Sequence, residues 1–171
     1  MTTDTILIRA ATVADVPPLH TLVQSAYRGD SARAGWTHEA DLVEGERITQ
    51  ATLAEIISHP DERILVAERS GVLIGSVQIS DRGSGIGYFG LLSVAPQLQA
   101  AGLGKMLIAA AEREAARLFH AALMEISVIE RRAELIAYYE RRGYARTGEF
   151  RPFPVLTTPP LRLMIMAKRL G

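Results

Sequence analysis

The apolar positions at the start of the chain follow a strand period and then a helical one. Residues 5–9 alternate between apolar and polar and predict a short strand. Apolar side chains then recur at helical spacing, at Leu19, Leu22, Val23 and Ala26. Thr12 and Asp15 have the separation of a capping box, in which polar groups satisfy the first amides of a helix. We therefore expect a first helix over about 14–27.

The middle of the chain predicts one more helix and then consecutive strands. Helical spacing recurs ahead of Pro60, at Leu53, Ile56 and Ile57. Two β-branched runs follow, Ile64–Glu68 and Val72–Ile79, with the turn-forming residues 69–71 between them. A second turn over 81–85 leads into Tyr88–Val94. Because parallel strands need a longer crossover, these short turns predict an antiparallel meander.

The second half alternates between helices and strands. A helix is expected to begin near Gly102, and a strand follows at Leu123–Ile129. The next helix carries cationic residues in its last turn and stops at Gly143. Two final strands are expected, near Tyr144–Phe150 and Leu161–Lys168. This order predicts a mixed α/β sheet with an antiparallel first half and one central βαβ crossover, in a single domain over 1–171.

Composition then narrows the function classes. Lys+Arg and Asp+Glu balance at 19 each, which argues against a nucleic-acid partner. The absence of cysteine excludes disulfides, thiolate metal sites and a cysteine nucleophile. The four histidines lack metal-ligand spacing, so no metal is expected. With neither a basic signal region nor an apolar run of roughly 18 residues, we expect a cytoplasmic protein without a membrane partner.

A glycine-containing segment at the start of the predicted helix carries the chemistry. Gln99, Gly102 and Gly104 form the pattern Gln-x-x-Gly-x-Gly directly after a strand that ends Ser-Val-Ala-Pro. Glycines let a ligand approach main-chain amides, and a helix N-terminus attracts anions, so the segment suits a pyrophosphate. Neither a Walker A loop nor a Rossmann fingerprint fits, because Gln99 and Leu107 stand where those motifs need glycine.

This segment resembles the pyrophosphate-binding motif of the GNAT acetyltransferase superfamily. A second motif of that superfamily is matched by residues 139–144, Tyr-Glu-Arg-Arg-Gly-Tyr. The resemblance implies a GNAT-like fold whose sheet splays at the coenzyme A site, acetyl-CoA as the cofactor, and an amine as the acceptor. It also implies a possible homodimer.

When the family's motif is aligned with this sequence, the resemblance implies specific contacts to the cofactor. The main chain of the strand before the loop would bind the pantetheine arm, and the loop amides would bind the diphosphate. The implied contact residues are Leu92, Ser93, Val94, Gln99, Ala100, Ala101, Gly102, Leu103, Gly104 and Lys105. Arg132 stands where many relatives have a pantetheine-binding asparagine, and an arginine there would serve a coenzyme A phosphate.

The resemblance also implies catalytic roles. Tyr139 occupies the position of the general acid that protonates the departing thiolate, although a core tyrosine is the competing interpretation. The strand before the loop contains no acid, so we name Glu39, Asp41 and Glu44, in the irregular segment 28–48, as candidate bases. The regions expected to flank the acceptor pocket contribute Tyr27, Trp36, His38 and Phe153.

Three functions fit these motifs. The leading prediction is acetylation of a small-molecule or peptide primary amine. The alternatives are a non-catalytic acyl-CoA-sensing module, favoured by the missing strand carboxylate and by Arg132, and an acetyltransferase for protein lysines or N-termini.

Overall fold

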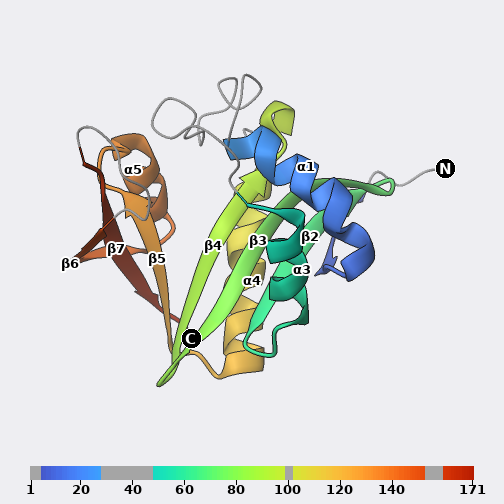
Figure 1. Cartoon of the computed structure of the whole chain (residues 1–171). Helices are drawn as coiled ribbons and strands as arrows, with labels where there is room; N and C mark the ends of the chain where they lie inside the picture. Colours follow the sequence, from blue (N-terminus) through green and yellow to red (C-terminus); the bar gives the residue numbers. More distant parts are fainter. Residues whose placement is uncertain (1–4, 28–47, 99–101, 153–159) are drawn as a thin grey trace.

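The structure, a computed structural model, describes residues 5–27, 48–98, 102–152 and 160–171. Its strands form one seven-stranded sheet in the order β1-β2-β3-β4-β5-β7-β6 (Figure 1). The strands are β1 (Leu7–Ala10), β2 (Glu62–Arg69), β3 (Val72–Gly83), β4 (Ile86–Val94), β5 (Leu123–Ile129), β6 (Ala145–Pro152) and β7 (Arg162–Arg169). The helices are α1 (Val16–Tyr27), α3 (Gln50–Ser58), α4 (Leu103–Phe119) and α5 (Ala133–Arg141), with short 3-10 segments η1 (Val13–Asp15) and η2 (Pro96–Leu98).

The pairing confirms the predicted topology. Strands β1 to β4 pair antiparallel in sequence order, and β4 pairs parallel with β5 through the crossover helix α4. The predicted turn over 81–85 is wrong in its extent, because β3 continues to Gly83. The reversal is tighter, with positive φ at Gly83, Ser84 and Gly85. The strand predicted at Tyr144–Phe150 begins one residue later and runs to Pro152.

Two helical layers cover the sheet, and β2 explains how. The consecutive residues Ile64, Leu65, Val66 and Ala67 are all buried. Side chains alternate across a strand, so Ile64 and Val66 pack with α1 and α3, whereas Leu65 and Ala67 join the larger core beneath α4 and α5. Figure 1 shows α1 and α3 on one face and α4 behind the other.

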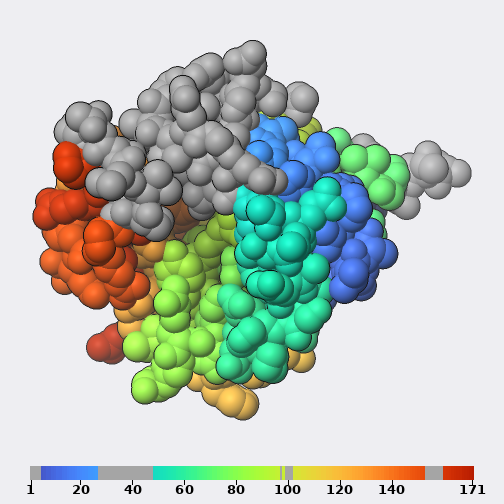
Figure 2. Space-filling view, in the orientation of Figure 1, coloured from blue at the N-terminus to red at the C-terminus, as the bar shows by residue number. Residues whose placement is uncertain are grey.

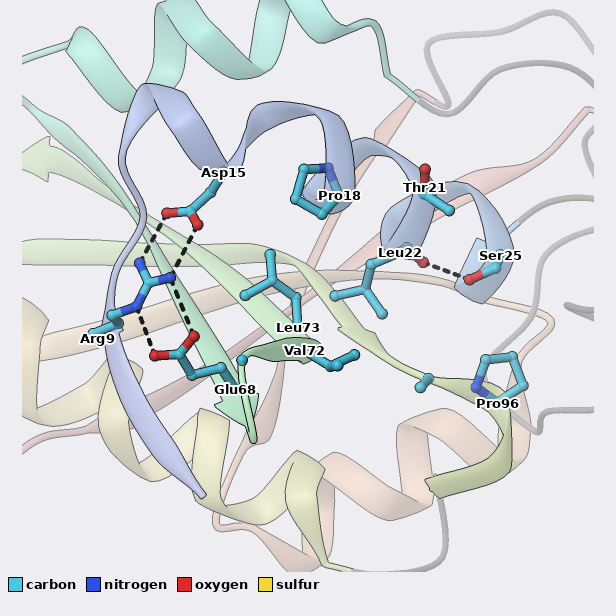
Figure 3. A pocket seen from close by; sticks show the side chains of 12 residues that line it. Arg9, Asp15, Pro18, Thr21, Leu22, Ser25, Glu68, Val72, Leu73 and Pro96 are labelled. Atoms are coloured by element: carbon cyan, nitrogen blue, oxygen red, sulfur yellow. Dashed lines mark hydrogen bonds and ion pairs between the residues drawn. The ribbon is translucent and has the colours of Figure 1, made fainter. Parts of the chain in front are cut away.

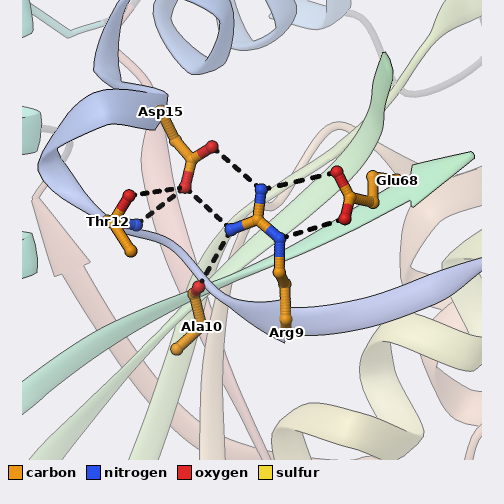
Figure 4. A network of polar contacts seen from close by, with 5 residues as sticks. All are labelled: Arg9, Ala10, Thr12, Asp15 and Glu68. Carbon is orange, nitrogen blue, oxygen red and sulfur yellow. Dashed lines mark hydrogen bonds and ion pairs between the residues drawn. The ribbon is translucent and has the colours of Figure 1, made fainter. Parts of the chain in front are cut away.

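The predicted capping box at the first helix is present and belongs to a larger network (Figure 4). The Thr12 amide donates to Asp15 Oδ2 at 2.7 Å. Arg9 on β1 donates to both oxygens of Asp15, at 2.8 and 2.9 Å, and through Nε to Glu68 at 3.2 Å. The ion pairs therefore join β1, the start of the first helix and the end of β2.

A second polar network joins α4 to the β6–β7 edge of the sheet. Glu112 on α4 accepts from the Tyr144 hydroxyl at 2.8 Å and from Lys168 Nζ at 3.0 Å. Burial and the neighbouring Glu112 carboxylate raise the pKa of Tyr144, so its hydroxyl remains a donor. The network therefore ties α4, which packs on β3 and β4, to Lys168 of β7 and to Tyr144 just before β6.

Candidate active site

Strands β4 and β5 diverge after a short parallel ladder. The ladder joins Ile86 to Leu123, Gly87 to Met124 and Tyr88 to Glu125, after which the strands separate (Figure 1). A bulge in β4 lies at this point, because Gln78 of β3 pairs with Gly90 while Ser76 pairs with Ser93. Leu91 within the bulge has a φ of 49°, an uncommon conformation for a branched residue. The bulge redirects the end of β4 away from β5 and confirms the expected splay.

Helix α4 begins beside the end of β4. Gly102 precedes the helix with a φ of 82° and provides no side-chain cap. The first intrahelical bond to Gly102 comes from the Met106 amide at 3.3 Å. The preceding amides of the first turn have no acceptor within the helix, and they lie at the positive end of its dipole. These features fit a diphosphate. Residues Gln99, Ala100 and Ala101 of the motif lie outside the described residues.

Helix α5 carries two adjacent tyrosines, Tyr138 and Tyr139, whose side chains have different neighbours. Tyr139 is buried, with its ring edge-on to Phe89 of β4 at 5.9 Å and to Tyr144 at 6.1 Å. Tyr138 is half-buried, and its hydroxyl lies 2.9 Å from the position that a Cβ on Gly104 would take. Burial raises the pKa of Tyr138, which keeps the hydroxyl protonated. Tyr138 is thus a neighbour of the glycine motif that the sequence analysis did not identify.

Arg132 lies immediately before α5 and is largely buried. Its Nε donates to Glu134 Oε1 at 2.9 Å, and only 7% of its side chain is exposed. Its carbonyl accepts from the Leu135 and Ile136 amides, at 3.0 and 2.9 Å. Arg132 therefore contributes to the start of α5, and its role toward a coenzyme A phosphate stays a prediction.

The sheet face opposite α4 presents polar side chains at the divergence. A Cβ on Gly87 would meet Ala115 and Met124 on the α4 side, so the next residue, Tyr88, points the other way. The Tyr88 hydroxyl is hydrogen-bonded to Ser127 of β5. Because Glu125 is two residues before Ser127, it shares that face. The molecular surface is recessed between β4 and the β6–β7 side of the sheet (Figure 2).

Glu125 is the carboxylate that this arrangement adds to the site. Its side chain is 17% exposed, and Arg151 Nη2 lies 3.6 Å from Oε1. The sequence did contain a signal, because Glu125 and Ser127 alternate with buried Met124 and Ile126 on a strand otherwise read as core. Alternation alone does not show that the polar face borders a divergence.

Several predicted site residues belong to segments that the structure does not describe. Those that lie outside the described residues are Glu39, Asp41, Glu44, Trp36, His38 and Phe153. Tyr27 ends α1, and its side chain likewise lies outside the described part. In the described ranges, no cluster of three or more His, Asp or Glu side chains could hold a metal ion, and no helix is long and apolar enough to cross a membrane.

Comparisons with known proteins agree with this geometry. Residues 34–157 match the family profile described as Acetyltransferase (GNAT) domain. An IAA acetyltransferase of Azospirillum brasilense is 33% identical over 129 residues, which are 74% of this chain and 75% of that protein. The chain therefore belongs to the GNAT acetyltransferase family: it is an acetyltransferase, and acetyl-CoA is its co-substrate.

Solved structures with low sequence identity share the fold. An N-acetyltransferase from Staphylococcus aureus Mu50 superposes with a TM-score of 0.76 at 12% identity, over 96% of this chain and 97% of that one. The ribosomal-protein-S18-alanine N-acetyltransferase from Escherichia coli gives 0.74 at 18%, over 98% and 95%. The yncA protein of Salmonella typhimurium, solved with its cofactor acetyl-CoA, gives 0.72 at 20%, over 98% and 95%.

Proposed function

We propose that the chain transfers the acetyl group of acetyl-CoA to a primary amine that approaches from the Tyr88 face of the sheet. The observation that carries the proposal is the divergence of β4 from β5 directly beside the uncapped N-terminus of α4. The divergence offers a slot for an extended arm, and the helix N-terminus offers amides for the diphosphate at its end. The amine acceptor goes beyond what family membership establishes.

In this proposal the main chain holds the co-substrate. The amides of Gly102 to Lys105 bind the diphosphate, together with Gln99 to Ala101 of the motif. Main-chain groups of Leu92 and Val94 bind the pantetheine arm. An amide of β4 directed at the thioester carbonyl oxygen would stabilise the negative charge that develops there.

Two protons must move for the acetyl group to transfer. The amine nitrogen lone pair forms the new C–N bond, the C–S bond breaks, and the electron pair leaves on sulfur. Tyr139 then donates its hydroxyl proton to the thiolate, because a thiolate is a better leaving group when a donor is near. The burial of Tyr139 against Phe89 of β4 supports this role, since it places the ring beside the strand that borders the divergence.

Among the residues that the structure describes, Glu125 is our candidate for accepting the proton from the amine. It lies on the face from which the amine approaches, opposite Tyr88 at the last paired position of the ladder. The hydrogen bond between Tyr88 and Ser127 lies beside it and provides a polar path toward the divergence. Glu39 and Asp41 stay candidates from the sequence.

A panel of primary amines tests the function, with release of the coenzyme A thiol as the readout. The names of proteins that share the fold suggest two members: spermidine and a peptide with an N-terminal alanine. We expect saturable, enzyme-dependent thiol release with at least one primary amine and none with its N,N-dimethyl analogue. Binding of acetyl-CoA without thiol release across a broad panel would instead support an acyl-CoA-sensing module.

Two glutamates that lie near the same arginine provide the test of the proposed base and its control. Arg151 Nη2 lies 3.6 Å from Glu125, and Arg151 Nε lies 3.3 Å from Glu149 Oε1. We expect Glu125→Gln to lower kcat/KM for the amine by about 10²-fold near neutral pH, with partial recovery at alkaline pH, where more amine is already deprotonated. Glu149→Gln is the control, and equal losses in the two variants would remove Glu125 from the mechanism.

A further inference from the structure

A pocket of about 620 Å³ lies apart from the strand divergence (Figure 3). One side of α1 forms a wall of it, the end of the β2–β3 hairpin forms another, and Ala95 and Pro96 close a third side. None of its lining residues belongs to β5 or α5. Its volume is in the range of pockets that hold small molecules.

The charged end of the pocket consists of Arg9, Asp15 and Glu68. A guanidinium has five N–H donors. In Arg9, Nη1 donates to Asp15 at 2.8 Å and to the Ala10 carbonyl at 3.1 Å, and Nη2 donates to Asp15 at 2.9 Å and to Glu68 at 3.5 Å. The fifth donor, the Nε–H group, donates to Glu68 at 3.2 Å. Arg9 therefore keeps no donor for an anionic ligand.

The same cluster has a net negative charge. Two carboxylates face one guanidinium, and the Arg9 hydrogen bonds lower the pKa of Asp15 to about 2, so Asp15 is charged at neutral pH. The pocket's other lining residues are apolar or bear only hydroxyl groups. An isolated positive charge would consequently find one unbalanced negative charge at this end.

The remaining walls suit a hydrocarbon group. Leu22 and Leu73 lie between the carboxylates at one end and Ser25 and Pro96 at the other (Figure 3). Val72, at the tip of the hairpin, is 61% exposed. Covering such apolar surface with a hydrocarbon group removes it from water and so favours binding.

We propose that this pocket binds a small organic cation, an ammonium group carried on a compact hydrocarbon body. The ammonium lies against Glu68 and Asp15, and the hydrocarbon lies between Leu22 and Leu73. The site is separate from the proposed acetyl-transfer site, and its occupancy requires neither acetyl-CoA nor turnover.

The test uses three probes of similar shape without acetyl-CoA. They are N,N-dimethylphenethylamine, which is cationic at pH 7 and has no N–H to acetylate once deprotonated, neutral 2-phenylethanol and anionic 3-phenylpropionate. Amide NMR shifts of the full chain report both affinity and location. We expect the amine to saturate with its largest shifts at Ser25, Gly71 and Val72, the alcohol to bind at least about tenfold more weakly, and the acid to show no saturation. Equal binding of the three, no binding of the amine, or shifts elsewhere would overturn the proposal.

Three variants locate the interaction. Glu68→Gln should weaken amine binding about five- to tenfold while affinity for the alcohol changes little. Glu130→Gln is the matched control, because Glu130 also pairs with an arginine, Arg162, at 2.8 Å but outside the pocket. Ser25→Leu fills the pocket and should abolish binding of amine and alcohol alike. Undiminished amine binding in Glu68→Gln or in Ser25→Leu would contradict the assignment, whichever of the two variants folds.

Discussion

The hydroxyl of Tyr138 occupies the space beside Gly104, 2.9 Å from where a Cβ at that position would lie. This contact joins α5, one residue before the second sequence motif, to the first turn of α4. The Arg142 guanidinium, 5.1 Å from the centre of the Tyr138 ring, lies over the same side chain. A glycine in a helix is ordinarily costly, and the contact gives it a steric reason here.

The first prediction concerns this contact. Alanine is favoured over glycine in a helix by up to about 1 kcal/mol. Gly104→Ala should nevertheless not stabilise the wild-type chain, because the added methyl meets the Tyr138 hydroxyl. In a Tyr138→Phe background the same change should stabilise the chain by up to about 1 kcal/mol. Urea unfolding of the wild type, the two single variants and the double variant measures the coupling, and additive effects would show that the contact does not constrain position 104.

The second prediction separates the adjacent tyrosines. Tyr139→Phe removes the proposed proton donor, so kcat should fall by about 10²-fold while acetyl-CoA affinity stays within a few-fold. Tyr138→Phe is the matched control and should leave kcat within a few-fold. Steady-state kinetics and titration with acetyl-CoA provide both values. If the two variants lose the same activity, Tyr139 is a packing residue rather than the acid.

The third prediction concerns the left-handed residue before α4. Gly102→Ala places a Cβ on a backbone with a φ of 82° and should cost about 1–2 kcal/mol of stability. Gly83→Ala is a close control, since Gly83 has a φ of 83° and open space around it at the β3–β4 turn. Both variants should lose similar stability, but only Gly102→Ala should weaken acetyl-CoA binding. Equal acetyl-CoA affinity in the two variants would contradict a role for the loop backbone.

The fourth prediction follows from the ion pairs of Arg9. The pKa of Asp15 is lowered to about 2 in the folded chain from an ordinary value of 3.8. Its contribution to stability is therefore fully present above about pH 4 and is lost as the pH falls toward 2. Asp15→Asn should flatten that part of the stability profile by about 1 kcal/mol, after allowance for solvent screening. Parallel profiles for the variant and the wild type between pH 5 and 2 would show that the Arg9 pairing adds no stability.

Local patterns predicted the elements on which the site is built. The run Ile64–Ala67 indicated a strand, the Thr12–Asp15 spacing indicated a helix start, and Gly102 indicated the beginning of α4. Each signal depends on neighbouring residues, so it can be read without knowing the packing. The mixed sheet with one parallel crossover followed from the order of these elements and the lengths of their connections.

Relationships across elements could not be obtained in this way. Leu91 gives no compositional sign of a bulge, because branched residues disfavour positive φ and adopt it here through the pairing of β4 with β3. The approach of Tyr138 to Gly104 depends on how closely α5 lies to α4. The hydrogen bond between Tyr88 and Ser127 joins residues 39 positions apart. Packing against distant segments decides all three.

Amide NMR of the chain titrated with acetyl-CoA tests the central claim most directly. The account predicts saturable shifts, largest at the amides of Gly102 to Lys105 and of Leu92 to Val94, because the diphosphate and the pantetheine arm bind there. Absence of saturable binding, or shifts concentrated on elements away from the start of α4 and the end of β4, would contradict it.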